Sequence, residues 1–212
     1  MMRVRVNFDK TEEMRFTGHL DLYRTWERTL RRAGLPLAYS QGFKPHPRLQ
    51  IAAALPLGFT SSNDLMDIWL EEKLPISFIQ SCILAALPPG LQLNSLTEVP
   101  LNQPALQSLL TASEYQITFL ESILDLEQRV QALTKHSSIL IERRGKNYDL
   151  RPLLLSIEIL IHNAEEQQRL KTLLRTDSAL HARPDELVNA MGIPAEKALF
   201  HRLKLHFNQE LT

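Results

Sequence analysis

The stretch 15–48 reads RFTGHLDLYRTWERTLRRAGLPLAYSQGFKPHPR and decides how the first half of the chain folds. On a helix over residues 18–33, indexed at 100° per residue, one side is an apolar stripe made of Leu22, Trp26, Leu30 and Ala33. The opposite side carries four arginines: Arg24, Arg28, Arg31 and Arg32. Gly34 then ends the helix and Pro36 prevents its resumption. The pattern predicts an amphipathic helix packed on a core.

Outward from this helix, the spacing of apolar residues predicts the order β-α-β-β-α-β. Strands are expected at 4–8, 49–58, 63–70 and 91–99, and a second helix begins with Pro75 in its first turn. Arg3 and Arg5 alternate with valines, so we expect the first strand to have a basic outer face. This order is the split βαβ of a ferredoxin-like sandwich, an α+β fold.

The second half repeats the order of elements without repeating the residues. Its predicted elements are a strand at 115–119, a helix at 123–133, a hairpin from Ile139 with its turn at 144–146, a second hairpin from strands 157–161 and 170–174 with its tip at 162–168, a helix at 183–191 and a strand at 199–207. We therefore expect two ferredoxin-like halves with antiparallel sheets, at 1–99 and 114–212, the second with an extra hairpin. Residues 100–113 show no clear period and are expected to be the linker.

The loop GFKPHPR (42–48) has two prolines that hold its backbone extended. Alternate side chains of an extended segment point the same way, which groups three potential cations: Lys44, His46 and Arg48. Nucleic-acid sites combine such cations with an aromatic ring on which a base stacks, here Phe43. The alternative is a structural turn with Phe43 buried in the core.

The four helix arginines have two interpretations as well. Guanidinium groups grip phosphates through several donors, and only Asp21 lies on the same side to neutralise them, with Glu27 nearer the flank. The alternative is the solvated face of an amphipathic helix.

The sequence assigns no catalytic residue; the nearest to a candidate are His19 and Asp21. A histidine at this helix start could act as a general base. However, His19 indexes beside Trp26, which favours a half-buried structural residue, and Gly18 with Asp21 has the spacing of a helix cap.

A secondary anion site in the second half would consist of Arg151, Arg175 and Arg183. The alternative for the first of them is an ion pair with Asp149 at a strand end.

The composition bounds the class of protein. The 212 residues are 44% hydrophobic and 23% charged, with zero net charge, which is ordinary for a globular protein. Residues 1–60 carry ten basic and five acidic side chains, which suits an anionic partner at that end unless the unevenness is chance. No CxxC pair, HExxH, phosphate loop or GxSxG is present, so the sequence indicates no metal and no cofactor.

The cysteine count and the distribution of apolar residues indicate the redox state and the compartment of the protein. Cys82 is the only cysteine, which excludes an internal disulfide. No run of about 18 apolar residues occurs, and the N-terminus alternates rather than forming a signal sequence. We therefore expect a cytoplasmic protein without a membrane partner.

Three segments resemble a known family. They are FTGHLDLYRTWERTLRRAGLPLAYSQGFKPHPRLQIAAALPLG (16–58), YDLRP (148–152) and ARPDEL (182–187). Together they are similar to the signature of the bacterial radical-SAM-linked domain of unknown function. Members occur alone or behind a radical-SAM module, often near genes for ribosomal proteins and ribonuclease E/G. The resemblance implies work in RNA or ribosome modification, with a radical-SAM protein and an RNA as partners, ribosomal or transfer RNA being expected first.

The resemblance supplies no catalytic residues, and one cysteine cannot hold an iron–sulfur cluster, so the chain is not expected to be an enzyme on its own. The first hypothesis is that the chain is a non-catalytic RNA-binding module. One alternative is a metal-independent endoribonuclease of the CRISPR-repeat-processing type, in which His19 assists attack by a 2′-hydroxyl and Arg24 or Arg28 stabilises the charged transition state. The other is a protein–protein adaptor that binds no nucleic acid. The sequence does not specify an oligomeric state.

Overall fold

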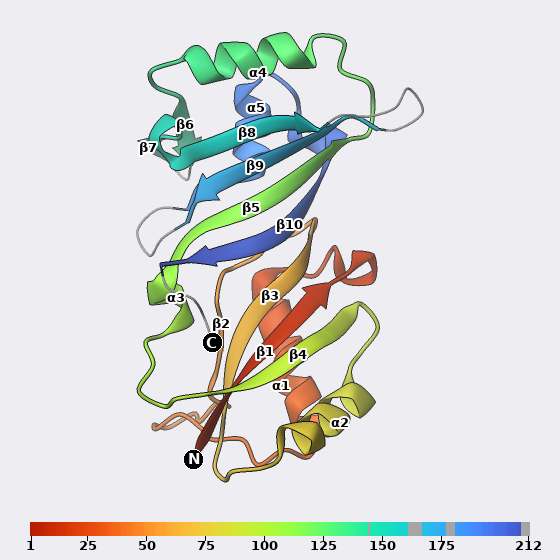
Figure 1. Ribbon diagram of the computed structural model, residues 1–212, viewed down its shortest axis with the longest axis vertical. Helices are drawn as coiled ribbons and strands as arrows, with labels where there is room; N and C mark the ends of the chain where they lie inside the picture. Colours follow the sequence, from red (N-terminus) through yellow and green to blue (C-terminus); the bar gives the residue numbers. More distant parts are fainter. Residues whose placement is uncertain (144, 161–166, 177–180, 209–212) are drawn as a thin grey trace. The chain divides into compact units, whose positions relative to one another are not determined.

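The computed structural model describes residues 1–143, 145–160, 167–176 and 181–208. The chain divides into two compact units, Met1–Leu110 with Phe207–Thr212, and Thr111–His206. It is an α+β protein, and its paired strands of known register are antiparallel (Figure 1). Within the described part of the chain, no helix combines the length and the apolar character needed to cross a membrane.

The elements of the first unit follow the predicted order. They are β1 (Met2–Lys10), a 3₁₀ turn (Glu12–Met14), α1 (His19–Arg32), β2 (Leu49–Ile51), β3 (Phe59–Leu70), α2 (Ile76–Ala86), β4 (Leu91–Val99) and α3 (Leu106–Leu109). The strands lie in the order β4-β1-β3-β2. Hence β1, the first strand of the chain, lies in the middle of its sheet with β4 and β3 on either side.

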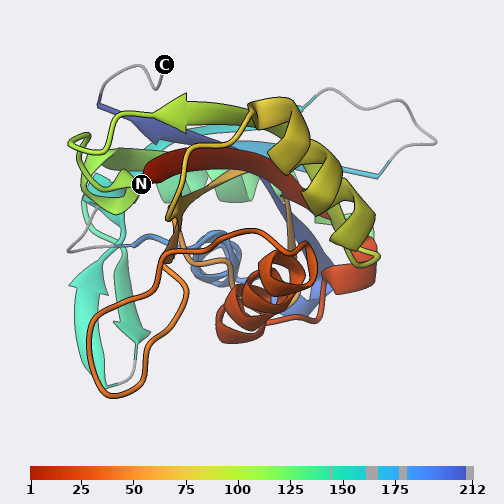
Figure 2. The same ribbon diagram turned by 90° about the horizontal axis from the view of Figure 1, so that it is seen from below.

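The apolar stripe of α1 is buried as predicted. Trp26 and Leu30 have no exposed surface, and the Trp26 ring meets the edge of Phe8 from β1 with 4.9 Å between centroids. Ile79 and Ile83 of α2 belong to the same cluster, so both helices cover one face of the sheet (Figure 2). Gly34 ends α1 with a φ of +68°, which a residue with a Cβ adopts only at a cost.

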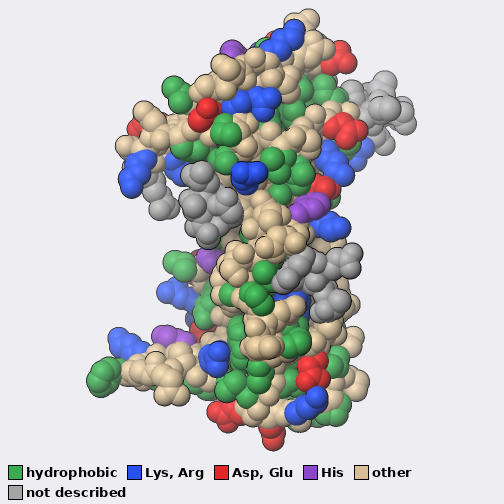
Figure 3. Space-filling view, turned by 60° about the vertical axis from the view of Figure 1, so that its left-hand side comes forward, with side chains coloured by type: hydrophobic (Ala, Val, Ile, Leu, Met, Phe, Trp, Pro, Cys, Tyr) green, Lys and Arg blue, Asp and Glu red, His purple; other side chains and the backbone are tan. Residues whose placement is uncertain are grey.

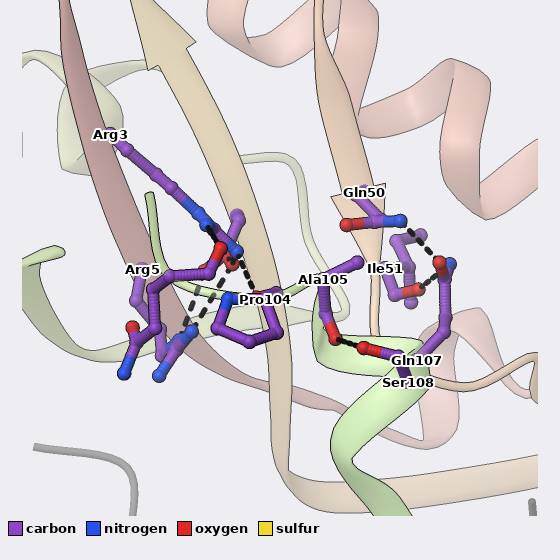
Figure 4. Close-up of polar contacts among 10 residues, drawn as sticks. Arg3, Arg5, Gln50, Ile51, Pro104, Ala105, Gln107 and Ser108 are labelled. Carbon is purple, nitrogen blue, oxygen red and sulfur yellow. Dashed lines mark hydrogen bonds and ion pairs between the residues drawn. The ribbon is translucent and has the colours of Figure 1, made fainter. Parts of the chain in front are cut away.

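The basic outer face expected for β1 is wrong. Arg3 and Arg5 are 2% and 6% exposed, and both donate to the Asp67 carboxylate of β3 at distances of 2.6–3.2 Å. Arg3 also donates to the carbonyl oxygens of Gln103 and Pro104 (Figure 4). The arginines point to the side away from the helices, as predicted, but the chain following β4 covers that side.

Residues 100–113, the predicted linker, contain the boundary between the two units, which falls after Leu110, but they are not irregular throughout. They contain α3 and the start of β5 (Leu110–Phe119), and Leu106, Leu109 and Leu110 are buried. Gln107 fastens α3 to β2 by donating to the carbonyl of Ile51 at 2.8 Å and by bonding to the Gln50 side chain (Figure 4).

The strand predicted at 49–58 is shorter than expected. The Ala52 N–H still donates to Leu65 at 2.8 Å, but the chain then leaves the sheet towards Pro56, which has no N–H to donate. Ala52 and Leu55 are nevertheless 1% exposed. The apolar run correctly indicated burial, and only its extension as a strand was wrong.

The second unit consists of β5, α4 (Leu126–Lys135), β6 (Leu140–Arg143), β7 (Lys146–Asp149), a 3₁₀ turn (Arg151–Leu153), β8 (Leu154–Leu160), β9 (Arg169–Arg175), α5 (Pro184–Ala190), a 3₁₀ turn (Ala195–Lys197) and β10 (Ala198–Phe207). The sheet order is β10-β5-β9-β8, while β6 and β7 pair with each other as a separate hairpin. The predicted extra hairpin is present; Arg144 of its turn and residues 162–166 of the other predicted tip lie outside the described residues.

The Trp26→Ala variant should lose about 3–5 kcal/mol of unfolding free energy, because it deletes a fully buried large aromatic side chain. Urea denaturation monitored by circular dichroism measures this loss. Arg28→Ala, on the exposed side of the same helix, should change the free energy by less than about 0.5 kcal/mol. Equal stability of the two variants would contradict the packing described for α1.

The Asp67→Asn variant should also lose about 3–5 kcal/mol, because it leaves two buried guanidinium groups without a countercharge. Glu98→Gln is the matched control, since Glu98 pairs with Lys73 at the surface, and it should cost less than about 1 kcal/mol. The same denaturation experiment compares them, and a wild-type midpoint for Asp67→Asn would show that the arginines need no carboxylate.

Candidate nucleic-acid interface

The loop between α1 and β2 is closed at its base by hydrogen bonds and projects from α1 (Figure 2). The Ser40 N–H donates to the carbonyl of His46 at 2.8 Å, and the His46 N–H donates to Ser40 Oγ at 3.0 Å. One step further down, the Arg48 N–H donates to the carbonyl of Ala38 at 2.7 Å. These bonds fix both ends of the loop and leave its tip, residues 41–45, at the surface.

The side chains of this loop tip face solvent. Phe43 is 109% exposed relative to the reference state, so the alternative in which its ring is buried in the core is wrong. Lys44, His46 and Arg48 are exposed as well, and the segment 39–48 contains no acidic residue. A projection at the lower left of Figure 3 accordingly shows hydrophobic, basic and histidine side chains together. The loop presents an aromatic ring among cations, as the binding interpretation requires.

At the base of the loop, three side chains form a row across the sheet. Trp69 of β3 is the register partner of Arg3 on β1, and its N–H donates to the carbonyl of Arg48 at 3.1 Å. The guanidinium carbons of Arg3 and Arg48 each lie 5.0 Å from the Trp69 ring centroid, within cation–π distance. Trp69 is a residue that sequence reasoning missed, because its alternation in a strand signalled only a half-buried position.

A pocket of about 520 Å³ opens beside this row, at the edge strand β2. Its lining contains two aromatic rings and two basic side chains but no carboxylate: Tyr23, Ser40, His46, Pro47, Arg48, Leu49, Gln50 and Trp69. The volume falls within the range of small-ligand pockets.

The arginines of α1 are exposed but not equivalent. Arg24 is 3.4 Å from Asp21, and Arg31 is 2.7 Å from Glu27, so Glu27 neutralises this face although its flank position suggested otherwise. Arg32 donates to the carbonyl of Ala86 at 2.5 Å and so serves packing between α1 and α2. Arg28 is exposed, and no carboxylate of the described residues pairs with it.

Two side chains of α1, Arg31 and Tyr23, lie close to the loop. The Arg31 guanidinium lies 6.0 Å from the ring of Tyr39 at the loop base, and Tyr23 of α1 lines the pocket with His46 and Arg48. The structure thus brings part of the arginine stripe to the loop. His19, in the first turn of α1, is half-buried as its indexing beside Trp26 indicated.

The three arginines of the predicted secondary anion site have separate surroundings. Arg151 donates to the carbonyl of His136 at 3.1 Å, beyond the C-terminus of α4, and Arg183 pairs with Asp185 at 2.7 Å. Arg175 is exposed at the end of β9, and its carbonyl accepts the N–H of Ala182. Two of the three guanidinium groups are therefore already engaged in local contacts.

Asp149 has a structural role that differs from the predicted side-chain ion pair. Its Oδ1 accepts the N–H of Ile139 at 2.7 Å and the N–H of Arg151 at 2.9 Å. These two backbone bonds lower the pKa of the Asp149 carboxyl, because they favour its charged form. The residue closes the base of the β6-β7 hairpin.

The second unit also contains a polar cluster that the sequence did not reveal. Arg143 of β6 donates to Glu186 of α5 at 2.6 Å and to the Tyr148 hydroxyl of β7 at 2.8 Å. The Tyr148 hydroxyl donates to Glu186 Oε2 at 2.5 Å. A pocket of about 460 Å³ lies beside Glu186, between α4, α5 and β6. Tyr148 and Glu186 come from YDLRP and ARPDEL, so two segments distant in sequence meet here.

Nowhere in the described ranges do three or more His, Cys, Asp or Glu side chains gather in a way that could hold a metal ion.

The cluster predicts a loss of stability at alkaline pH. Burial, and then the hydrogen bond to Glu186, raise the pKa of the Tyr148 phenol. An unfolded phenol ionises near pH 10 while the folded one keeps its proton, so this contribution to stability is complete below about pH 10 and declines as the pH rises towards the folded pKa. Denaturant unfolding over an alkaline pH series should show this decline, and Tyr148→Phe should reduce it. Tyr39→Phe, at the exposed loop base, should leave the decline unchanged; identical curves for all three proteins would contradict the cluster.

Comparisons with known proteins give a family but no close relative. No curated protein matches the sequence. Among solved structures, a Cbf5-Nop10-Gar1 complex has a similar chain at a TM-score of 0.48 and 10% identity, covering 95% of this chain and 48% of that one. The archaeal box H/ACA Nop10-Cbf5 complex gives 0.42 and 12%, covering 94% and 46%. This chain thus spans about half the length of those chains.

A putative glycine cleavage system transcriptional repressor gives a TM-score of 0.26 at 12% identity, covering 99% of this chain and 98% of that one. Similarities of this strength carry no conclusion about function. The family comparison is different, because one family model matches residues 3–184, most of the sequence. The chain therefore belongs to DUF2344, a family of uncharacterized proteins conserved in bacteria.

Proposed function

We propose that this chain is an RNA-binding module that docks an RNA substrate for a separate modifying enzyme. The observation that carries the proposal is the loop at 38–48, with its fully exposed Phe43 among exposed Lys44, His46 and Arg48. Exposing a large aromatic ring to water is unfavourable, and a base that stacks on the ring removes that cost. The neighbouring cations then hold the phosphates on either side of the base.

The charge around the loop supports an anionic ligand. The segment 39–48 has three basic side chains and no acidic one, and Arg28 and Arg31 extend the basic surface along α1. Arg31 is 52% exposed even in its pair with Glu27, so its remaining donors can reach a phosphate. Such a surface binds the RNA backbone without selecting a sequence, and this binding weakens with salt.

The partner part of the proposal rests on the segments GHLD, YDLRP and ARPDEL, which resemble the radical-SAM-linked domain. With Cys82 as its one cysteine, the chain has too few thiolates for an iron–sulfur cluster, so a radical-SAM protein is the proposed partner. Ribosomal or transfer RNA is the proposed substrate. The strand orders β4-β1-β3-β2 and β10-β5-β9-β8 support describing both units as ferredoxin-like, the second with the β6-β7 hairpin added.

Binding of structured RNA measured over a salt series tests the proposal. The double variant Lys44→Ala/Arg48→Ala should weaken binding about tenfold or more, equal to about 1.4 kcal/mol. The slope of log affinity against log salt should fall by about 0.7–0.9 for each phosphate contact removed. The control Lys73→Ala/Lys197→Ala removes the same charge from two exposed ion pairs elsewhere and should bind as the wild type does.

A flat salt response, or equal weakening by both double variants, would contradict binding at the loop. The same preparations incubated with total RNA in EDTA separate binding from the endoribonuclease alternative. An RNA-binding module leaves the RNA intact. Discrete cleavage that is lost in His19→Ala would instead identify a nuclease.

A further inference from the structure

We infer that the pocket beside Trp69 holds one unpaired nucleotide of the bound RNA, with its base on the Trp69 ring and its phosphate on Arg48. The inference rests on the proposed function and adds that the substrate offers a single-stranded segment. It arises from a pocket of about 520 Å³ in which aromatic and cationic side chains meet without a carboxylate. This combination fits a nucleotide, which has one flat apolar surface and one anionic group.

The Trp69 ring lies against an anchored side chain. On one side it contacts Arg3, whose guanidinium is bonded to the Asp67 carboxylate at 2.6 Å and to the carbonyl of Pro104 at 2.9 Å. Arg3 is 2% exposed, so its side chain cannot move into solvent without breaking several hydrogen bonds. Trp69 itself is only partly buried. A ring with an anchored inner neighbour and an accessible remainder is suited to stacking, because little side-chain entropy is lost on binding.

Arg48 has the opposite character. Its side chain is exposed, and the described contacts of its guanidinium are the Trp69 ring at 5.0 Å and the Met1 sulfur at 3.8 Å, both weak. No carboxylate of the described residues pairs with it. A phosphate offers Arg48 a charge-assisted bond stronger than either contact. Moving to that phosphate leaves the ring surface to the base.

The remaining lining groups suit a base edge and exclude a duplex. Gln50 donates one amide N–H to Gln107, and Ser40 Oγ accepts the N–H of His46. The Gln50 carbonyl oxygen is left as an acceptor in the pocket and the Ser40 hydroxyl as a donor. In an A-form helix the bases are stacked and paired, and their faces are not available to a protein ring. Only an unpaired base, in a loop, bulge or end, can enter.

Tryptophan fluorescence tests the inference in the unaltered protein, because the chain has two tryptophans and the other, Trp26, is fully buried. A short single-stranded uridine oligonucleotide should quench the emission and bind about tenfold or more tighter than an RNA duplex of equal length. Trp69→Leu should lose this preference and the quenching, while its duplex affinity stays within about twofold of the wild type. Arg48→Gln should weaken single-strand binding without changing the melting temperature.

The matched control is Phe16→Leu, which removes another aromatic side chain of the first unit, 79% exposed and 5.7 Å from an arginine, Arg15. It should keep both the quenching and the preference. Equal affinity for single strand and duplex, with unchanged emission, would refute the nucleotide pocket and leave RNA binding standing. Absence of binding to either RNA would refute the proposed function itself. If Trp69→Leu does not fold, the inference is still tested by quenching in the unaltered chain and by the affinity of Arg48→Gln for single-stranded RNA.

Discussion

The structure of the first unit depends on one buried carboxylate. Asp67 accepts hydrogen bonds from both Arg3 and Arg5, and these bonds offset the desolvation cost of burying three charged groups. One carboxylate does not saturate two guanidinium groups, so Arg3 also takes carbonyl oxygens from Gln103 and Pro104. The chain after β4 must therefore cross this face of the sheet. The same arginine supports Trp69, which connects the buried network to the surface pocket.

Much of the fold could be predicted because local periodicity determines local structure. The strand expected at 91–99 is β4 with those bounds, and the helix expected at 18–33 is α1 with one cap at each end. The errors arise where a distant segment of the chain covers a surface that the local pattern predicts to be exposed. Alternation placed Arg3 on the side away from the helices, but no local pattern shows that α3 and the residues before it cover that side. The signal that the sequence offered for this covering segment was its leucines, and Leu106, Leu109 and Leu110 are buried in the structure.

The candidate site was predictable to a similar extent. The basic side chains of 42–48 are exposed, and so is Phe43, whose burial the sequence left open. The pairing of Arg31 with Glu27 follows from their i, i+4 spacing and could have been deduced. Trp69 and Glu186 could not, because each acquires its role from partners far away in the chain. A tryptophan in an alternating strand is ordinary until Arg3 and Arg48 are known to flank it.

The β6-β7 hairpin has a consequence for local dynamics. In the described part of the chain its two strands pair only with each other, and an isolated two-stranded hairpin has marginal stability in water. Its attachments include the bonds of Arg143 and Tyr148 to Glu186 and the bonds that close its base at Asp149. Such a segment opens as a unit without unfolding the sheet. We therefore expect amide hydrogens of residues 140–143 to exchange with solvent through local opening, and those that pair β5 with β9 to exchange only when the second unit unfolds.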